Sequence, residues 1–339
     1  MKQILFRLAI LLIISSASCF ARDIFVTPSS SIRPEIAKAV PGDTVIFSAG
    51  TYKDSSFTIL CNNVTVRAET SGSVYLNGHT SIIISGNSVT FSGFQFTSGA
   101  NDGIVITVTG DDDSLAELNF SGYSAKKYIS LAGRRDVVSN CNFENKPASA
   151  PKGNLIHIET RKDGEPNNAV IRYCSFKHMS GSGGDDGNEC IRITNGELSS
   201  YNCGTVVEYC FFTDTGGGDS EAISVKSAGN TLRYNTMSDN MHANFCFRNG
   251  NNNSAYGNKF IRSGGIRIKN ASDITCTNNY FEDCGDGKIT APVKYVPVPD
   301  AHNHERIVVS GNTFSGGSSI ELCGDASENT WKNNTFIKN

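Results

Sequence analysis

Short apolar phrases recur along the chain at nearly constant intervals. One phrase, an Asn or Cys followed two residues later by Phe or Met, recurs from Cys141-Asn-Phe143 to Asn334-Thr-Phe336, and Phe96 and Phe120 fit the same register upstream. From Phe96 onward the intervals between these apolar residues are 24, 23, 33, 36, 25, 23, 21, 33 and 22 residues. Most intervals lie near 22–25, and the longer ones are the same unit with a loop added. A repeat of this length is typical of a solenoid.

A second phrase runs in step with the first and alternates strictly between apolar and polar positions. It occurs as Cys190-Ile-Arg-Ile-Thr, Ala222-Ile-Ser-Val-Lys, Asn244-Phe-Cys-Phe-Arg and Gly265-Ile-Arg-Ile-Lys. Each is a short strand with one apolar face, which a single coil cannot bury. Coils stacked at the strand spacing of ~4.8 Å would form a continuous core. The sequence therefore predicts an all-β fold, a single-stranded right-handed parallel β-helix. We expect one inward column to contain Ile191, Ile223, Phe245 and Ile266.

The repeated Asn and Cys residues would form a ladder in such a fold. The side chain at one coil position lies above its copy in the next coil, so hydrogen bonds can run along the stack. The Asn members are Asn235, Asn258, Asn279, Asn312 and Asn334. Cys141, Cys174 and Cys210 fall in the same column and are interpreted as small buried hydrophobes. A disulfide between two of them is the alternative.

The two irregular regions predict a cap and a loop. Residues 32–40, which precede Pro41-Gly42-Asp43, are expected to form a short amphipathic helix that covers the open end of the first coil. Residues 291–305, with three prolines and two histidines, lack the repeat and are predicted to be a loop.

The N-terminus has the pattern of a secretory signal peptide. A Lys at position 2, a short apolar run and small residues up to Ala21 predict that residues 1–21 are removed and that 22–339 form one β-helix domain. We expect a secreted or periplasmic protein, with lipid anchoring through Cys19 as the alternative. No later segment has the ~20 apolar residues of a membrane span. The net charge of −3 gives no general attraction for a nucleic acid. We expect a monomer.

Aligning the strands brings cations together on the outer face. Lys226 and Arg248 are 22 residues, or one coil, apart and should lie side by side, where like charges repel. Such a pair suits an anionic ligand; two solvated surface cations are the alternative. The same face should carry His157, Arg192, Arg267 and Lys269.

Acidic residues gather beside these cations. Asp219 and Glu221 precede Lys226. The matching region one coil earlier contains Asp185, Asp186, Asn188 and Glu189. Carboxylate and amide oxygens that converge in this way suit Ca²⁺. An ordinary acidic loop is the alternative.

These residues carry a resemblance to the chondroitinase B and alginate lyase family of polysaccharide lyases, family six. The resemblance extends from about Asp23 to the C-terminus, and its specific part is Glu221-x4-Lys226-Ser followed one coil later by Arg248-Asn-Gly-Asn. It implies β-elimination on a uronate-containing polysaccharide, of the alginate or dermatan/chondroitin type. Lys226 would then be the base and Arg248 would assist the leaving oxygen. Asp219, Glu221 and either Asp186 or Asn188 would bind Ca²⁺, while Arg192, Arg267, Lys269 and His157 would line the substrate groove.

Three departures from the family pattern affect what it implies. Asn249 follows Arg248 where the family usually has His, Asp219 stands where the family usually has Glu, and the interval from Lys226 to Arg248 is one residue longer than usual. Two other functions remain open. One is a non-catalytic β-helix that binds an anionic carbohydrate. The other is a β-helical hydrolase, which would use paired carboxylates.

Overall fold

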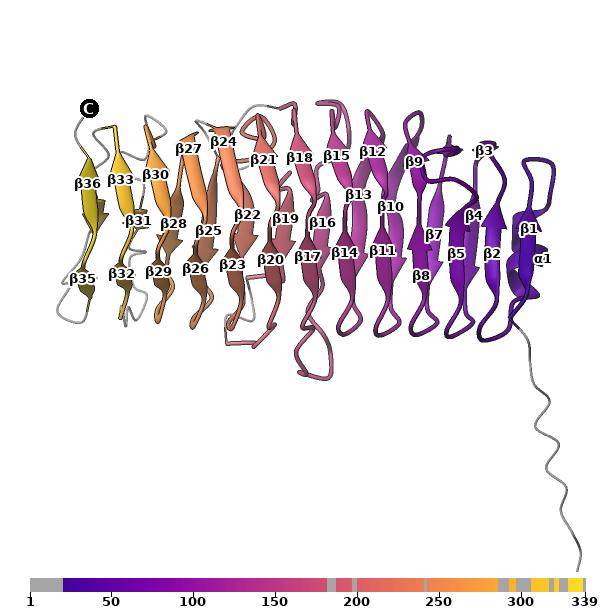
Figure 1. Ribbon diagram of the computed structural model, residues 1–339, viewed down its shortest axis with the longest axis horizontal. Helices are drawn as coiled ribbons and strands as arrows, with labels where there is room; N and C mark the ends of the chain where they lie inside the picture. Colours follow the sequence, from indigo (N-terminus) through magenta and orange to yellow (C-terminus); the bar gives the residue numbers. More distant parts are fainter. Residues whose placement is uncertain are drawn as a thin grey trace, which may run out of the picture.

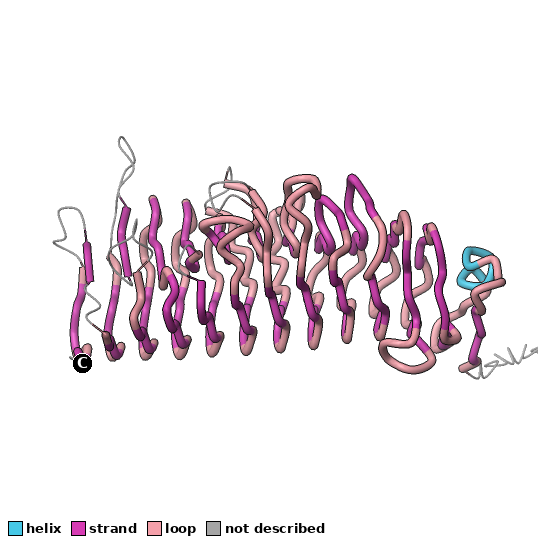
Figure 2. The backbone as a smooth tube through the Cα atoms, turned by 90° about the horizontal axis from the view of Figure 1, so that it is seen from above, coloured by secondary structure: helices cyan, strands magenta, loops and turns pink. Residues whose placement is uncertain are grey.

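The computed structural model describes residues 21–181, 187–196, 200–240, 243–285, 293–296, 306–316, 320–322 and 329–337. These residues form a row of stacked coils with a short helix at the N-terminal end (Figure 1, Figure 2). In the described part, no helix is long and apolar enough to cross a membrane. The predicted signal peptide, with Cys19, lies almost wholly outside the described residues.

Each full coil contributes one strand to each of three parallel sheets, which we name A, B and C. Sheet A consists of β1 (Asp23–Val26), β2 (Thr44–Phe47), β5 (Thr65–Ala68), β8 (Thr90–Ser92), β11 (Ser114–Ala116), β14 (Val137–Ser139), β17 (Val170–Arg172), β20 (Val206–Glu208), β23 (Thr231–Arg233), β26 (Ser254–Tyr256), β29 (Thr275–Thr277), β32 (Val308–Ser310) and β35 (Thr330–Lys332). Sheet B consists of β3 (Gly50–Lys53), β6 (Val74–Asn77), β9 (Phe94–Phe96), β12 (Asn119–Ser121), β15 (Asn142–Glu144), β18 (Ser175–Lys177), β21 (Phe211–Thr213), β24 (Thr236–Asn240), β27 (Lys259–Ser263), β30 (Tyr280–Glu282), β33 (Thr313–Ser315) and β36 (Thr335–Ile337). Sheet C consists of β4 (Ser56–Ile59), β7 (Ser81–Ile84), β10 (Ala100–Val108), β13 (Ser124–Leu131), β16 (Ile156–Ile158), β19 (Ile191–Ile193), β22 (Glu221–Val225), β25 (Asn244–Arg248), β28 (Ile266–Lys269), β31 (Val293–Val296) and β34 (Ile320–Leu322). The predicted parallel β-helix is confirmed.

Stacked apolar side chains fill the interior. From Phe96 to Phe212, the rings of sheet B lie nearly parallel, with 4.3 to 5.4 Å between successive centroids. Met237 interrupts this ring column. Phe245, from sheet C, contacts the rings on either side of the interruption edge-on, at 5.4 Å from Phe212 and 5.1 Å from Phe260. The core therefore stays closely packed where the repeat departs from Phe.

The asparagine ladder is also confirmed. Along the five predicted members, each Nδ2 group donates to the Oδ1 atom of the next at 3.0 to 3.1 Å. Each Oδ1 atom also accepts the backbone N–H of the preceding member. Cys210 precedes the ladder, and its backbone N–H donates to Asn235 at 3.0 Å. All nine cysteines of the described part are free, so no disulfide forms among them.

Two predicted boundaries need correction. The N-terminal helix α1 (Ile32–Ala37) ends before the predicted Val40, because Val40 precedes Pro41 and that position disfavours helical backbone. Ile36 is buried and packs into the end of the core, as expected of a cap. The predicted loop 291–305 contains β31, which pairs with β28 and β34. Val293–Val296 is a short segment flanked by prolines, so the sequence pattern did not indicate a strand there. Residues 297–305 lie outside the described residues.

Candidate active site

The candidate site lies on the outer face of sheet C, where β19, β22 and β25 follow one another in register. Ile191, Ile223 and Phe245 are paired neighbours and fully buried, and Phe245 pairs in turn with Ile266. The predicted inward column is therefore confirmed. Because side chains alternate along a strand, the residues between these apolar positions project from the outer face.

The same register fixes two outward columns. One contains His157, Arg192, Ser224, Cys246 and Arg267, which are successive Cα partners. In the other, Val225 pairs with Phe247, so Lys226 and Arg248 follow on adjacent coils. Arg248 pairs with Lys269. The predicted adjacency of the two cations is confirmed by this register.

Lys226 and Arg248 line one cavity of about 200 Å³, which three carboxylates also line. Its lining residues are Gly187, Glu189, Arg192, Asp219, Glu221, Lys226 and Arg248. Three of them are acidic and three are basic, so opposite charges are concentrated within a small, open cavity.

Asp219 is held at this cavity by the backbone. Its Oδ2 atom accepts the N–H of Gly187 at 2.7 Å, and its Oδ1 atom accepts the N–H of Glu221 at 2.9 Å. Burial and the nearby charge of Glu189 raise the pKa of the Asp219 carboxyl to about 6. The charge of this carboxylate is therefore not fully compensated by the protein.

The two glutamates connect the acids to the bases. Glu221 accepts a hydrogen bond from Arg248 Nη1 at 3.1 Å and another from the Ser224 hydroxyl. The Oε1 atom of Glu189 lies 3.5 Å from Arg192 Nε and 4.0 Å from Lys226 Nζ. These contacts orient each basic side chain toward the carboxylates.

Lys226 is unusually enclosed for a lysine, with 8% of its surface exposed. Gly196 lies against its stem: a Cβ atom at that position would be 3.9 Å from Lys226 Cδ. Burial lowers the pKa of the Lys226 amine, and the charge of Arg192 lowers it further. The unprotonated amine is therefore easier to form here than on an open surface.

Other candidates from the sequence lie outside the cavity lining. The Oδ1 atom of Asn188 accepts hydrogen bonds from the Gly153 N–H at 2.9 Å and from Lys146 Nζ at 3.4 Å. His157 is buried, with Nδ1 3.0 Å from Glu159 Oε1. Arg267 and Lys269 continue the two outward columns one coil past Arg248.

One predicted ligand cannot be placed, and one acid of the cavity was expected only as a member of the acidic region. Asp186 lies outside the described residues. Glu189 was placed in the acidic region because its phrase aligns with that of Glu221, but it was not named as a Ca²⁺ ligand. Within the described part, no group of three or more His, Cys, Asp or Glu side chains is already arranged as a metal site. The three carboxylates line one cavity without forming a closed ligand set.

Several solved structures with a similar fold are polysaccharide lyases. The family six alginate lyase AlyGC matches with a TM-score of 0.77 and 21% identity over 94% of this chain and 53% of AlyGC. A mannuronic acid specific family six lyase from human gut microbiota matches with a TM-score of 0.72 and 18% identity over 93% of this chain and 82% of that protein. At these identities the similarity shows a common fold, and the chain spans about half the length of AlyGC.

The sequence itself shows the family. The Chondroitinase B family model matches residues 26–322, so the chain belongs to that family. A search of curated proteins finds no match.

Proposed function

We propose that this protein is a lyase that cleaves a uronate-containing polysaccharide by β-elimination, with Lys226 as the base. The observation that carries the proposal is the shared cavity, in which an enclosed lysine and an arginine from adjacent coils face three carboxylates. Membership of the Chondroitinase B family supports it. Alginate and dermatan- or chondroitin-type polymers are the candidate substrates.

Lys226 would remove the proton at C5 of the uronate. Only the neutral amine can accept that proton, and both burial and Arg192 favour the neutral form. As the C5–H bond breaks, a double bond forms between C4 and C5 and the C4–O4 bond breaks. Lys226 keeps the proton until solvent removes it.

Arg248 would stabilise the departing O4 atom. Its hydrogen bond to Glu221 orients the guanidinium group, whose planar set of donors suits an oxygen that gains negative charge. Arginine is not a practical acid because its pKa exceeds ~12. The proton that O4 needs would therefore come from water beside Arg248.

We also propose that Glu189, Asp219 and Glu221 hold Ca²⁺. Three buried carboxylates around one cavity suit a hard divalent cation, and the raised pKa of Asp219 is evidence of uncompensated negative charge. Bound Ca²⁺ would offset the negative charge on the substrate carboxylate. Asn188 is excluded from this set because its side-chain oxygen already accepts two hydrogen bonds away from the cavity.

The test is ultraviolet absorbance during incubation with a panel of uronans. β-Elimination creates a C4–C5 double bond conjugated to the carboxylate, which absorbs in the ultraviolet, whereas hydrolysis or binding alone creates none. We expect absorbance to rise with at least one uronan. Chelation should lower the rate of this rise. New reducing ends without absorbance would instead indicate a hydrolase, and binding without either product would indicate a binding protein.

A further inference from the structure

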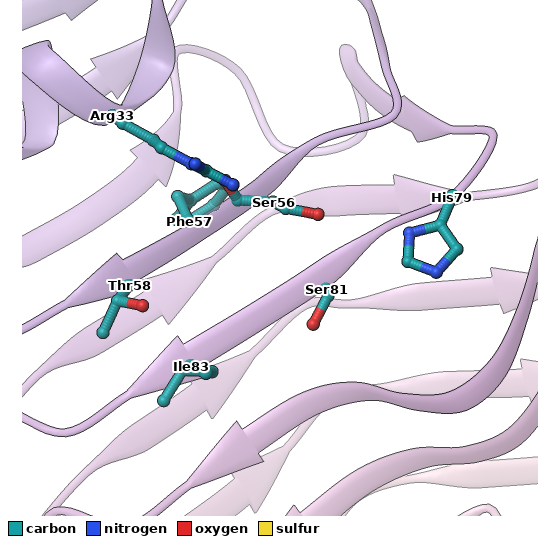
Figure 3. A pocket seen from close by; sticks show the side chains of 7 residues that line it. All are labelled: Arg33, Ser56, Phe57, Thr58, His79, Ser81 and Ile83. Carbon is teal, nitrogen blue, oxygen red and sulfur yellow. The ribbon is translucent and has the colours of Figure 1, made fainter.

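A second cavity lies on sheet C near the N-terminal end, remote from the candidate active site. It measures about 650 Å³, and its polar lining residues are Arg33, Ser56, Thr58, His79 and Ser81. Figure 3 shows the guanidinium group of Arg33 and the imidazole ring of His79 on either side of Ser56 and Ser81. No carboxylate is among the described lining residues, so cationic and hydroxyl groups define its chemistry.

The fold directs these side chains outward. On β4 and β7, Ser56 pairs with Ser81. Phe57 and Ile82, the next residues along these strands, are also partners and are buried, so the alternate positions face the cavity. Arg33, from α1, is tethered by a hydrogen bond of 2.7 Å from its Nε atom to the Ser56 carbonyl.

The second cavity lies in line with the candidate active site. Successive Cα partners on sheet C run from Thr58 through Ile83, Thr107, Ser130 and His157 to Arg192. Thr58 lines the second cavity and Arg192 lines the first. Five steps at the strand spacing of ~4.8 Å separate them by roughly 24 Å along the solenoid axis. One extended polymer lying along sheet C could therefore contact both cavities.

We propose that the second cavity is a distal binding site for an anionic saccharide, which holds the far part of the polymer whose scissile bond lies at Lys226. The proposal rests on the proposed function for its choice of polymer. Arg33 would pair with a uronate carboxylate, and the serine and threonine hydroxyls would bond to sugar hydroxyls. Ile83, which also lines the cavity and is exposed, would contact the apolar face of the sugar. Two linked contacts raise affinity for any chain long enough to span them and leave shorter chains unaffected.

The test compares a uronan polymer with an oligomer of the same uronate shorter than roughly 24 Å. For Arg33→Ala we expect KM for the polymer to rise about tenfold, as for a lost hydrogen bond to a charged group, with kcat unchanged. KM for the short oligomer should stay at the parent value. His79→Ala changes an exposed side chain and should also raise KM for the polymer. This second variant tests the proposal independently of any disturbance of α1 by Arg33→Ala.

The control variant is Lys53→Ala, which removes an exposed cation from the same coil on sheet B and should change neither KM. Equal polymer KM values for the parent, Arg33→Ala and His79→Ala would overturn the proposal. So would equal losses for polymer and short oligomer, because these would remove the length dependence.

Direct binding separates this proposal from the proposed function. Calorimetric titration of polymer into Lys226→Ala, and into the same variant with Arg33→Ala added, requires no turnover. If the parent produces no ultraviolet absorbance but the added Arg33→Ala still weakens polymer binding, the lyase assignment fails and the distal site stands. If absorbance appears but binding is equal in both variants, the lyase assignment stands and the distal site fails.

Discussion

Asp136→Asn should stabilise this protein at neutral pH. Asp113 and Asp136 are buried at the same position of consecutive coils. The Oδ1 atom of Asp136 accepts the backbone N–H of Asp113 at 3.1 Å, and that of Asp113 accepts the N–H of Val89 at 2.7 Å. The Oδ2 atom of each is buried without a hydrogen-bond partner. Burial raises the pKa of Asp113 to about 7 and that of Asp136 to about 8.

Asparagine at the same coil position shows what the substitution would gain. Asn253 makes the same backbone contact through Oδ1, and its Nδ2 group donates to the carbonyls of Gly250 and Ser227 at 2.9 and 3.0 Å. The positions equivalent to Gly250 and Ser227 around Asp136 are Gly133 and Gly110. An amide at 136 can therefore donate where an ionised carboxylate cannot.

The raised pKa of Asp136 makes the stability of the protein depend on pH. The Asp136 pKa is higher in the folded state than its ordinary value of 3.8, so the folded state keeps a proton that the unfolded chain releases. Below about pH 4 the buried carboxyl costs no free energy of unfolding through ionisation. The free energy of unfolding then falls as pH rises from about 4 toward about 8. At pH 7 the loss is at most about 4 kcal/mol. Asn does not ionise and avoids this loss.

The assay is the thermal unfolding midpoint at pH 4 and at pH 7. At roughly 1.5 °C per kcal/mol for a chain of this size, Asp136→Asn should raise the midpoint by up to about 6 °C at pH 7 and by little at pH 4. The matched control is Asn253→Asp, which should lower the midpoint at pH 7 and leave it nearly unchanged at pH 4. A gain from Asp136→Asn that is equal at both pH values, or a loss at pH 7, would refute the reasoning.

Three further predictions concern the site and the ladder. Arg248→Lys should lower kcat at least tenfold and restore little over Arg248→Ala, because an ammonium lacks the planar donor set; equal steady-state rates for Arg248→Lys and the parent would contradict this. Glu189→Gln should weaken Ca²⁺ binding in a calorimetric titration, and Asn188→Ala should not. Weaker binding in Asn188→Ala with unchanged binding in Glu189→Gln would instead identify Asn188 as the ligand. Asn258→Ala should cost roughly 2–4 kcal/mol, since it leaves the buried backbone N–H of Asn235 without its partner and removes one of the two hydrogen bonds that Asn279 Oδ1 accepts. Its thermal midpoint should fall by several degrees, and an unchanged midpoint would mean that the ladder does not stabilise the stack.

The sequence predicted the fold well because a parallel β-helix repeats one local rule. Each coil must place its apolar residues inward and in register with its neighbours, so periodicity alone located the columns of Ile223 and Asn258. The end of α1 and strand β31 were missed because prolines dominate the local pattern there. Their extent depends on pairing with distant coils.

The site was predicted less completely, for a physical reason. Register placed Lys226, Arg248 and Glu221 on adjacent coils, since those positions follow from strand alignment. The direction of the Asn188 side chain depends on Lys146 and Gly153, which belong to a different coil and a loop. Glu189 lines the cavity and Asn188 does not, and periodicity carries no information about which of two neighbouring residues does so.

The most direct test of the central claim is the ultraviolet absorbance produced by Lys226→Ala on a uronan that the parent cleaves. The Lys226 side chain is enclosed by the cavity but is not part of the hydrophobic core, so this variant should fold, with a thermal midpoint close to that of the parent. It should bind the polymer with nearly parental affinity while producing no absorbance above the uncatalysed rate. Absorbance at most of the parental rate would contradict the assignment of Lys226 as the base.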